Sequence, residues 1–340
     1  MPRGGKREGA GAKKKASEDL KVPMLLYLDR EVANLIRKES SIASTSHSEF
    51  VNNHIRNIKL HQPKIISFVN QAGGVAKTTM TMNLGYHLSQ LGHRVLLIDL
   101  DPQASLTTFM GLESHDLQET VANSLIDENF VLPIHSQLHG MDLVPSNLEL
   151  SSIELQLVSV MARETLLKRA IAKIQDGYDF ILIDCPPNLG ILNVIALTAS
   201  THVIVPVETQ YKSFKGVESL LGTIGRIKQH VNPSLKIGGF IPTMHTTATS
   251  QNTYILNALK VNVKSVAPLF PEISRATAFA DASMHHQPLA VFSPSHAAIE
   301  VMVLIARLIE QLDDEAETKS ILAQIESVKV DKLTITGGKK

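Results

Sequence analysis

The sequence predicts an α/β protein in which a parallel β-sheet carries helices on both faces, preceded by a small N-terminal strand-helix-helix module. Apolar runs of strand length alternate with helix-patterned stretches between residues 64 and 313, which is the order that builds a parallel sheet. A glycine-rich loop joins the first of these strands to the first helix. A shorter pattern of one strand and two helices occupies residues 21–60, which are too few to bury a core alone.

The strands are predicted from short apolar runs, of which residues 64–69 are the first and residues 203–207 are the most apolar. Their expected spans are 64–70, 94–99, 141–145, 179–184, 202–207 and 235–242. Helices are predicted from the spacing of apolar residues at 78–91, within 151–175, and at 191–199, 213–230, 250–262 and 294–313. Loops after the carboxyl ends of parallel strands are expected to build the functional site.

Composition limits the class of protein. The chain has 340 residues, of which 44% are hydrophobic and 19% are charged, as in ordinary soluble globular proteins. Its apolar runs are too short to span a membrane, and the basic N-terminus lacks the apolar centre of a secretory signal. Cys185 is the single cysteine, which excludes internal disulfides. We therefore expect a cytoplasmic protein.

Positive charge is concentrated at the N-terminus. Residues 1–21 contain seven Lys or Arg residues and three acidic ones, a net charge of +4 in a chain whose formal net charge is zero. Several glycines and almost no apolar side chains predict a basic, disordered tail over residues 1–20. DNA is one expected partner, with candidate contacts at Lys13, Lys14, Lys15 and Lys21. A tail that only adds solubility is the alternative.

Residues 21–60 resemble a ribbon-helix-helix DNA-binding module, which dimerises through its strand and places a two-stranded ribbon in the major groove. The resemblance rests on a strand pattern at 22–28, on Asp29 as a helix N-cap, and on a second helix at 48–58. Only Lys21 is charged among the strand positions that face away from the module's core. A dimerisation module that reads no DNA sequence is the alternative.

A large domain is expected at residues 61–315, after a linker in which Pro63 prevents the preceding helix from continuing. Residues 316–340 are expected to form a C-terminal helix or tail. This segment lacks the lysine-rich polar face of a membrane-binding helix, so we expect it to dock on a partner or to fray.

Residues 70–79, Asn-Gln-Ala-Gly-Gly-Val-Ala-Lys-Thr-Thr, form a predicted phosphate-binding loop between a strand and a helix. Such a loop directs backbone N–H groups and the positive end of a helix dipole at an anion. Lys77 adds a cation and Thr78 a ligand for Mg²⁺. The expected nucleotide-binding residues of the loop are Gly73, Gly74, Val75, Ala76, Lys77, Thr78 and Thr79.

Acidic residues end two other strands. Asp99 and Asp101 follow the apolar run at 94–98, and one of them could position a water molecule. Asp184 ends the strand at 179–184, where a carboxylate beside a phosphate loop typically supports Mg²⁺. A strand-end aspartate alone is more often a turn former, but three such features in order favour nucleotide chemistry.

The sequence resembles the ParA/MinD group of deviant Walker-box ATPases, which are P-loop NTPases, and is most similar to its ParA side. The matching motifs, over roughly residues 64–312, are residues 70–79, 99–103, 143–147, 184–187, 205–207 and 271–275. The resemblance implies that Lys77 binds the β- and γ-phosphates of ATP, that Thr78 and Asp184 support Mg²⁺, and that Asp101 orients the attacking water.

The resemblance also implies partners and a cellular role. Members form ATP-dependent homodimers, bind DNA non-specifically, hydrolyse ATP slowly, and are released by a ParB-like or adaptor protein that stimulates hydrolysis. We accordingly expect a nucleoid-associated protein with no membrane partner. Arg275 matches an arginine that relatives use on the DNA backbone. Pro242, Thr243, Met244 and Pro271 are the candidate contacts to the nucleotide base.

Two positions depart from the family pattern. Ala72 replaces a signature lysine that reaches across the dimer, as in the McdA subgroup that positions carboxysomes. Lys212 or Lys215, in the first turn of a predicted helix, is the expected catalytic substitute; a solvated lysine is the alternative. Ala76 replaces a glycine, and we expect its φ angle to be negative because an alanine is disfavoured at positive φ.

Three functions remain open on the sequence. The first is a ParA-type ATPase for partition of plasmid or chromosomal DNA, which could also repress its own operon through the N-terminal module. The second is an McdA-like ATPase that positions a protein cargo. The third is a nucleotide-sensing transcriptional regulator with little turnover. His285 and His286 suggest no metal site, because neighbouring side chains diverge and no third ligand is suitably spaced.

Overall fold

The computed structural model describes residues 41, 46, 62–263, 265–314, 316–318 and 320–323. The chain divides into two compact units, Met1–Leu60 and His61–Lys340. The predicted tail, with Lys13, Lys14, Lys15 and Lys21, and nearly all of the predicted ribbon-helix-helix module lie outside the described residues.

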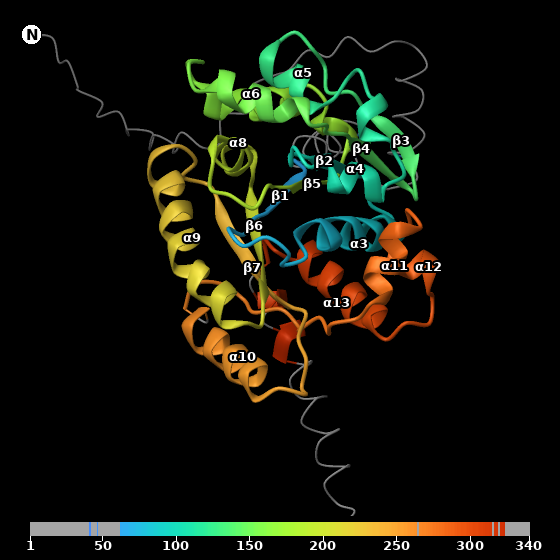
Figure 1. The fold of residues 1–340 in the computed structure, drawn as a ribbon, viewed down its shortest axis with the longest axis vertical. Helices are drawn as coiled ribbons and strands as arrows, with labels where there is room; N and C mark the ends of the chain where they lie inside the picture. Colours follow the sequence, from blue (N-terminus) through green and yellow to red (C-terminus); the bar gives the residue numbers. More distant parts are fainter. Residues whose placement is uncertain are drawn as a thin grey trace, which may run out of the picture. The chain divides into compact units, whose positions relative to one another are not determined.

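A seven-stranded sheet forms the centre of the second unit (Figure 1), in the order β3-β4-β2-β5-β1-β6-β7. The strands are β1 Lys64–Phe68, β2 Val95–Asp99, β3 His135–Leu138, β4 Met141–Val144, β5 Phe180–Asp184, β6 His202–Glu208 and β7 Lys236–Thr243. All neighbours pair in parallel except β3, which is antiparallel to β4. The predicted parallel sheet is confirmed, with one antiparallel edge strand that the sequence did not reveal.

The missed strand β3 has the sequence His-Ser-Gln-Leu and no buried residue. An edge strand pairs on one side only and can be short and polar, so it lacks the apolar run from which the other strands were predicted.

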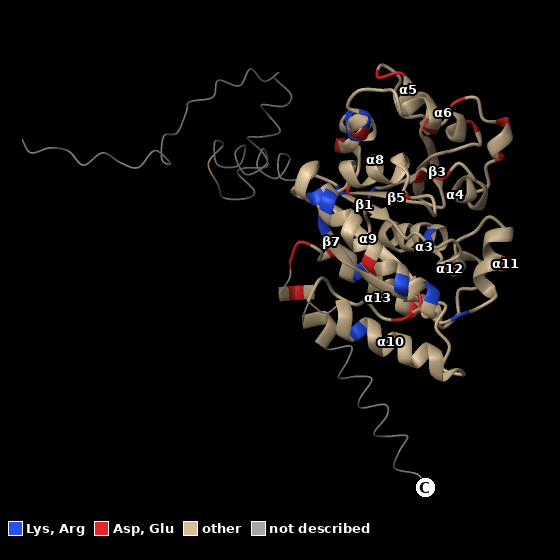
Figure 2. Cartoon of the chain, turned by 60° about the vertical axis from the view of Figure 1, so that its left-hand side comes forward, with Lys and Arg blue, Asp and Glu red and all other residues tan. Residues whose placement is uncertain are grey.

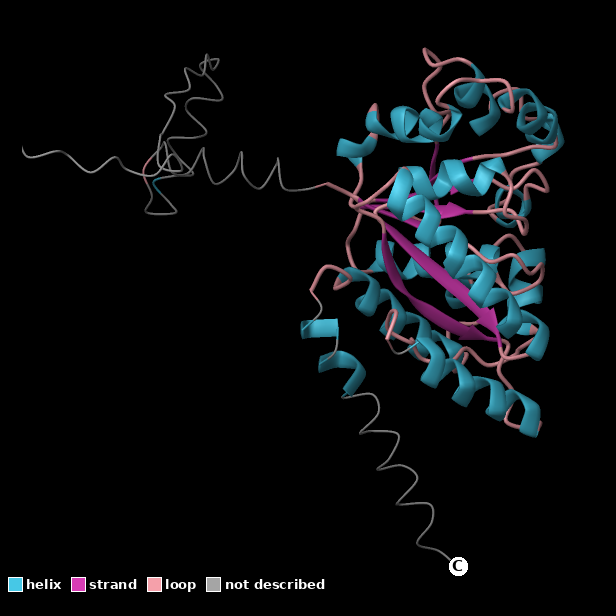
Figure 3. Cartoon of the chain, turned by 90° about the vertical axis from the view of Figure 1, so that its left-hand side faces the viewer, coloured by secondary structure: helices cyan, strands magenta, loops and turns pink. Residues whose placement is uncertain are grey.

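Helices cover both faces of the sheet, as predicted (Figures 1 and 3). Within the described residues they are α3 Lys77–Gln90, α4 Ser105–Phe109, α5 Val121–Ile126, α6 Glu149–Leu157, α7 Leu166–Ala172, α8 Ile191–Ala199, α9 Tyr211–His230, α10 Ser250–Val263, α11 Ala278–Met284, α12 Leu289–Phe292 and α13 Ala298–Glu310. The short helices α4, α5, α11 and α12 were not predicted, and α13 begins at Ala298 rather than at residue 294.

Alternate residues of each central strand enter two separate cores, because successive side chains of a strand point to opposite faces. On β1, Ile65 packs with helices α5–α10, whereas Ile66 and Phe68 pack with α3 and α13. Gly85 lets α3 lie close to the sheet, since a Cβ there would come within 2.8 Å of a methyl group of Leu97.

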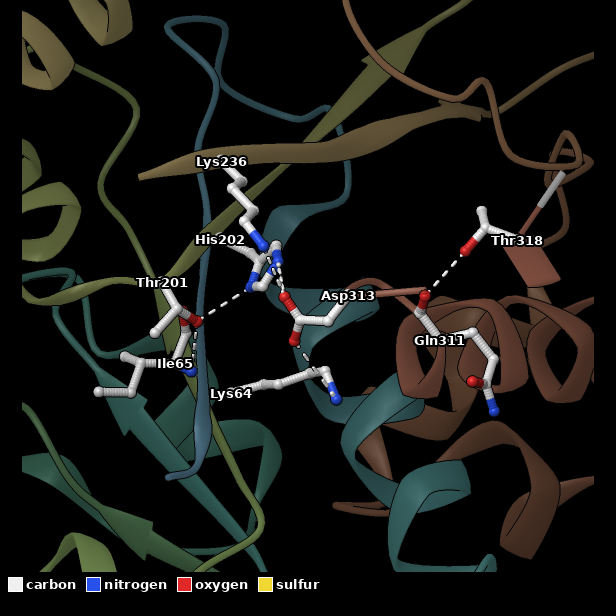
Figure 4. Close-up of polar contacts among 8 residues, drawn as sticks. All are labelled: Lys64, Ile65, Thr201, His202, Lys236, Gln311, Asp313 and Thr318. Carbon is white, nitrogen blue, oxygen red and sulfur yellow. Dashed lines mark hydrogen bonds and ion pairs between the residues drawn. The ribbon is translucent and has the colours of Figure 1, made fainter. Parts of the chain in front are cut away.

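The segment after α13 is fastened to the sheet edge that holds the amino ends of the parallel strands (Figure 4). The Asp313 carboxylate accepts a hydrogen bond from Lys236 Nζ at 2.8 Å and lies 3.4 Å from His202 Nε2 and 3.7 Å from Lys64 Nζ. Beyond it, Thr318 Oγ1 donates to the Gln311 carbonyl at 2.8 Å. Asp313 thus joins the starts of β1, β6 and β7 to the segment that follows α13.

Asp313→Asn is expected to lower the free energy of unfolding at pH 7 by roughly 1 kcal/mol or less, because the carboxylate is half exposed and screened by solvent. Burial opposes ionisation of Asp313, but the hydrogen bond from Lys236 and the positive charges around the carboxylate outweigh it and hold its pKa below its usual value. A depressed pKa stabilises the fold above the unfolded-state pKa. Urea titrations should show the deficit at pH 7 and its loss below about pH 4; a pH-independent deficit would argue against the ionic contact.

Candidate functional site

The predicted phosphate loop and the predicted acidic residues come together at one edge of the sheet. Strand β5 lies between β1 and β2, and Asp184 is in register with Phe68 on one side and Asp99 on the other. The loop after β1 leads into α3, which begins at Lys77. The carboxyl ends of β1, β2 and β5 therefore build the site, as expected for a parallel sheet.

Three elements hold the phosphate loop in shape. The Asn70 amide donates to the Pro206 carbonyl on β6 at 2.6 Å and accepts from Ala72 N at 3.0 Å. Thr243 Oγ1 at the end of β7 donates to the Val75 carbonyl at 3.0 Å. Gln71 Nε2 donates to Ser219 Oγ on α9 at 3.1 Å, which places α9 beside the loop.

The Lys77 side chain curls back onto the same loop. Its Nζ donates to the carbonyl oxygens of Asn70 and Ala72, each at 3.3 Å. Burial lowers the pKa of Lys77, opposed by the negative charge of Asp184. A buried ammonium held only by two long hydrogen bonds to carbonyls is well placed to take a stronger, charge-assisted bond from a phosphate oxygen.

Thr78 and Asp184 form the clearest candidate for a magnesium site. Thr78 Oγ1 donates to Asp184 Oδ2 at 2.6 Å. The other carboxylate oxygen, Oδ1, is buried and has no hydrogen-bond donor among the described residues. Burial, followed by the nearby charge of Asp99, raises the pKa of Asp184 well above its usual value. A hydroxyl and a buried carboxylate with a free oxygen suit Mg²⁺, a hard cation that takes few protein ligands.

The two acidic residues after β2 have different surroundings. Asp99 is fully buried and accepts hydrogen bonds from Thr107 N at 2.8 Å, Thr107 Oγ1 at 2.7 Å and Asp101 N at 3.1 Å. Burial raises its pKa to about 6 despite these bonds. Asp101 is only partly buried, and one of its oxygens accepts from Gln103 N at 3.0 Å. Asp99 therefore shapes the loop, and Asp101 is the carboxylate that can reach a reactant.

The expectation of a negative φ at Ala76 is wrong. Ala76 has φ 71° and ψ 28°, in the left-handed region, immediately before the first residue of α3. This turn brings the chain from the loop into the helix, and glycine adopts it without the strain that a Cβ adds. The Ala76 methyl group instead helps to line a cavity next to the loop.

Ala76→Gly is expected to relieve left-handed strain and raise the free energy of unfolding by up to about 1 kcal/mol, with no loss of nucleotide affinity. Urea unfolding and a nucleotide titration would measure both. Thr79→Gly, which removes a neighbouring cavity-lining side chain from a residue within α3, serves as the control and should destabilise the protein. Destabilisation by Ala76→Gly would mean that packing of the methyl group outweighs the strain.

A cavity of about 240 Å³ opens beside the phosphate loop and is mainly apolar. Of the predicted base-contacting residues, Thr243 and Met244 line it, whereas Pro242 and Pro271 are buried and do not. The wall that the sequence did not predict comes from residues 273–277 and Phe279. The segment at 271–277 contains Pro271, a predicted base contact, but the residues of the segment that reach the cavity are 273–277.

Arg275, the predicted DNA contact, lines this cavity, and the predicted catalytic lysines, Lys212 and Lys215, lie on the helix that contacts the phosphate loop. Arg275 Nη2 pairs with Glu208 Oε1 at 2.8 Å, and its side chain also lines the cavity. Lys212 and Lys215 are exposed in the first turns of α9, the helix that contacts the phosphate loop through Ser219. Residues three, four and seven apart share a helix face, so both lysines lie on the same side of α9 as Ser219.

Comparison with known proteins identifies the family. A family model described as an AAA domain matches residues 63–237. The sporulation initiation inhibitor protein Soj of Bacillus subtilis is 35% identical over 246 residues, which are 72% of this chain and 97% of Soj. The chain belongs to the ParA/MinD-type family of P-loop ATPases. The chromosome partitioning protein ParA of Caulobacter vibrioides is 30% identical over 266 residues, 76% of this chain and 97% of that protein.

Solved structures agree with the family and with the expected cofactors. Cobyrinic acid a,c-diamide synthase from Mycobacterium smegmatis, with a bound ATP analogue and magnesium, is 35% identical with a TM-score of 0.60, over 66% of this chain and 91% of that one. The expected cofactors of this ParA/MinD-type chain, ATP and Mg²⁺, are confirmed at the level of such relatives. Among the described helices, none has the length and apolar character needed to cross a bilayer.

Asp184→Asn is expected to separate magnesium binding from folding. Without nucleotide, it should raise the free energy of unfolding by about 1 to 2 kcal/mol, because an amide replaces a buried, incompletely bonded carboxylate and its oxygen can still accept from Thr78. A raised folded-state pKa costs stability as pH rises, so this gain should shrink as the pH falls towards 4. The increase in Tm that Mg²⁺ and ATP give the unmodified protein should disappear.

Thermal unfolding with and without Mg²⁺ and ATP, at pH 7 and pH 4.5, would measure these effects. Asp142→Asn, at a carboxylate on β4 that accepts from Tyr178 Oη at 2.8 Å, is the control and should leave the magnesium effect intact. An undiminished Tm increase in Asp184→Asn would exclude Asp184 from the metal site.

Proposed function

We propose that the protein is a ParA-type ATPase that dimerises on ATP, binds DNA non-specifically and drives the partition of plasmid or chromosomal DNA. The main supporting observation is the Thr78–Asp184 pair, with its free carboxylate oxygen, beside Lys77 at the start of α3. Family membership and the named roles of Soj and ParA relatives point in the same direction.

Each residue of the site has a separate role in the proposed hydrolysis of ATP. Backbone N–H groups of residues 73–79 and the ammonium of Lys77 hold the phosphates, and the cavity lined by Met244 accommodates the base. Thr78 and Asp184 hold Mg²⁺, which neutralises charge that develops on the phosphates when it is bound. Asp101 orients the attacking water. Positioning and electrostatics supply most of the acceleration in phosphoryl transfer, so these few groups suffice.

A lysine of α9 replaces the signature lysine that is absent at Ala72. Both candidates, Lys212 and Lys215, lie within the first two turns of α9, whose first turn contains no acidic residue. Their positive charges oppose the helix dipole unless an anion lies nearby. Phosphates bound by a second copy would supply that anion. The contact between Gln71 and Ser219 keeps this part of α9 next to the protomer's own phosphate loop.

Lys212→Ala, Lys215→Ala and the double variant test the replacement. The responsible substitution should weaken ATP-dependent dimerisation at least tenfold, measured by sedimentation with a slowly hydrolysed ATP analogue, and leave nucleotide binding by the monomer intact. Lys228→Ala near the other end of α9 is the matched control. Normal dimerisation of the double variant would show that neither lysine crosses the dimer.

DNA binding is supported by the distribution of charge. Helix α9 contains Lys212, Lys215, Arg226 and Lys228 and one acidic residue, Glu218, and α10 contains Lys260 and no acidic residue. Figure 2 shows basic segments along α9 and on α10. Arg275 and the basic residues 13–15 and 21 remain further candidates. Contacts of this kind neutralise phosphates, so affinity should fall steeply with salt.

The McdA-like function stays a second candidate because Ala72 stands in place of the signature lysine, as in that subgroup. An ATPase assay with DNA and a ParB-like partner tests the proposal: DNA and partner together should raise kcat well above the basal rate. Deleting residues 1–60 should abolish specific binding near the chain's own coding region and spare non-specific binding. Basal turnover alone, with or without partner, would favour a nucleotide-sensing regulator.

A further inference from the structure

A glutamate of α6 reaches the loop that follows Asp184. Glu154 lies between the core residues Ile153 and Leu157 and is itself only partly buried. Its Oε1 lies beside the N-terminus of α8, 2.6 Å from the position that a Cβ on Gly190 would take, and the backbone N–H of Leu192 in the first turn of α8 lowers its pKa by hydrogen bonding. The N-cap residue of α8 is Gly190, which has no side chain and so makes no side-chain capping hydrogen bond. Glu154 therefore supplies, from another helix, the acceptor that an N-cap side chain usually provides.

The fit between Glu154 and α8 depends on the absence of a side chain at Gly190. A Cβ on Gly190 would lie 2.6 Å from Glu154 Oε1 and 3.1 Å from Asn188 Oδ1. The backbone of Gly190, with φ −73° and ψ −171°, is one that any residue adopts. A side chain at position 190 would therefore have to displace the Glu154 carboxylate from its present place.

The first turn of α8 in turn fixes the loop from residue 185 to residue 190. Asn193 Nδ2 donates to the Pro186 carbonyl at 3.1 Å. The next residue, Pro187, reaches the phosphate loop, since a Cβ on Gly73 would lie 3.9 Å from its Cβ. The loop after Asp184 thus runs from the first turn of α8 to the neighbourhood of Gly73 in the phosphate loop.

The electrostatic setting agrees with this geometry. Burial raises the pKa of Glu154, the bond from Leu192 opposes that rise, and the negative charge of Asp101 adds to it. Glu154 is thus close enough to sense the charge of the residue that orients water, and its own charge lies at the positive end of α8.

We propose that Glu154 is a positioning residue for ATP hydrolysis: its carboxylate anchors the first turn of α8 and, through it, the loop between Asp184 and the phosphate loop. The hydrolytic part rests on the proposed ATPase function. The structural part, the anchoring of α8, does not. Small displacements of groups around a reacting phosphate reduce turnover far more than they reduce binding, because positioning supplies much of the catalysis.

Glu154→Ala should lower kcat for ATP roughly tenfold and change KM by less than about twofold. Hydrogen exchange of the full chain without nucleotide should become faster at the amides of residues 191–193. Glu154→Gln keeps an oxygen acceptor for Leu192 and should restore slow exchange and most of kcat. Glu149→Ala, an exposed glutamate on the same helix, is the matched control and should change none of these quantities.

Gly190→Ala gives an independent test, because its methyl group must displace the Glu154 carboxylate. It should reproduce the effects of Glu154→Ala, and the double variant should be no slower than either single one. If the losses in kcat multiply in the double variant, the two residues do not act through one shared contact.

Unchanged hydrogen exchange in Glu154→Ala would overturn the anchoring of α8. Faster hydrogen exchange with a normal kcat would overturn the role of Glu154 in hydrolysis. Absence of ATPase activity in the unmodified protein would instead contradict the proposed function, while the exchange data still decide the anchor.

Discussion

The contact between Thr78 and Asp184 is the constraint on which the rest of the site depends. A carboxylate that is fully buried and only half satisfied is costly to the fold, and it can persist only where the surrounding structure leaves it no alternative. The central position of β5, with paired strands on both sides, provides that rigidity. The cost becomes useful when a divalent cation arrives, because the ligand is already desolvated and oriented.

The phosphate loop also depends on rigid elements around it. Its backbone shape is set by side chains from β6, β7 and α9, and not by the loop alone. A movement of α9 therefore reaches the loop directly through Gln71 and Ser219. In the proposed dimer, this contact would give α9 a direct effect on the phosphate loop of its own protomer.

The parts of the molecule that the sequence predicted well are those encoded by local signals. The apolar run before Asn70 and the acidic ends at Asp101 and Asp184 each lie within a few residues of the strand that positions them, and parallel pairing then brings them together. The N-terminal motifs of the predicted module lie outside the described residues, so that interpretation stays a prediction.

The features that escaped prediction depend on contacts between distant segments. One wall of the cavity beside the phosphate loop comes from residues 273–277, about 200 positions after that loop. Glu154 has no motif around it, and its partner Gly190 is distant in sequence. The prediction of a negative φ at Ala76 was wrong for a different reason. The avoidance of positive φ by alanine is a preference of about 1–2 kcal/mol, which the geometry of the loop overrides.

The cluster around Asp313 has a topological consequence. Lys64 opens the first strand and Asp313 follows the last long helix, yet their charged groups are 3.7 Å apart. The first and last parts of the ATPase domain thus lie close together, as is common for the ends of a domain. New ends could be cut elsewhere and the old ones joined by a short linker. Both ends of the domain therefore lie where the parallel strands begin, at the opposite end of these strands from the phosphate loop.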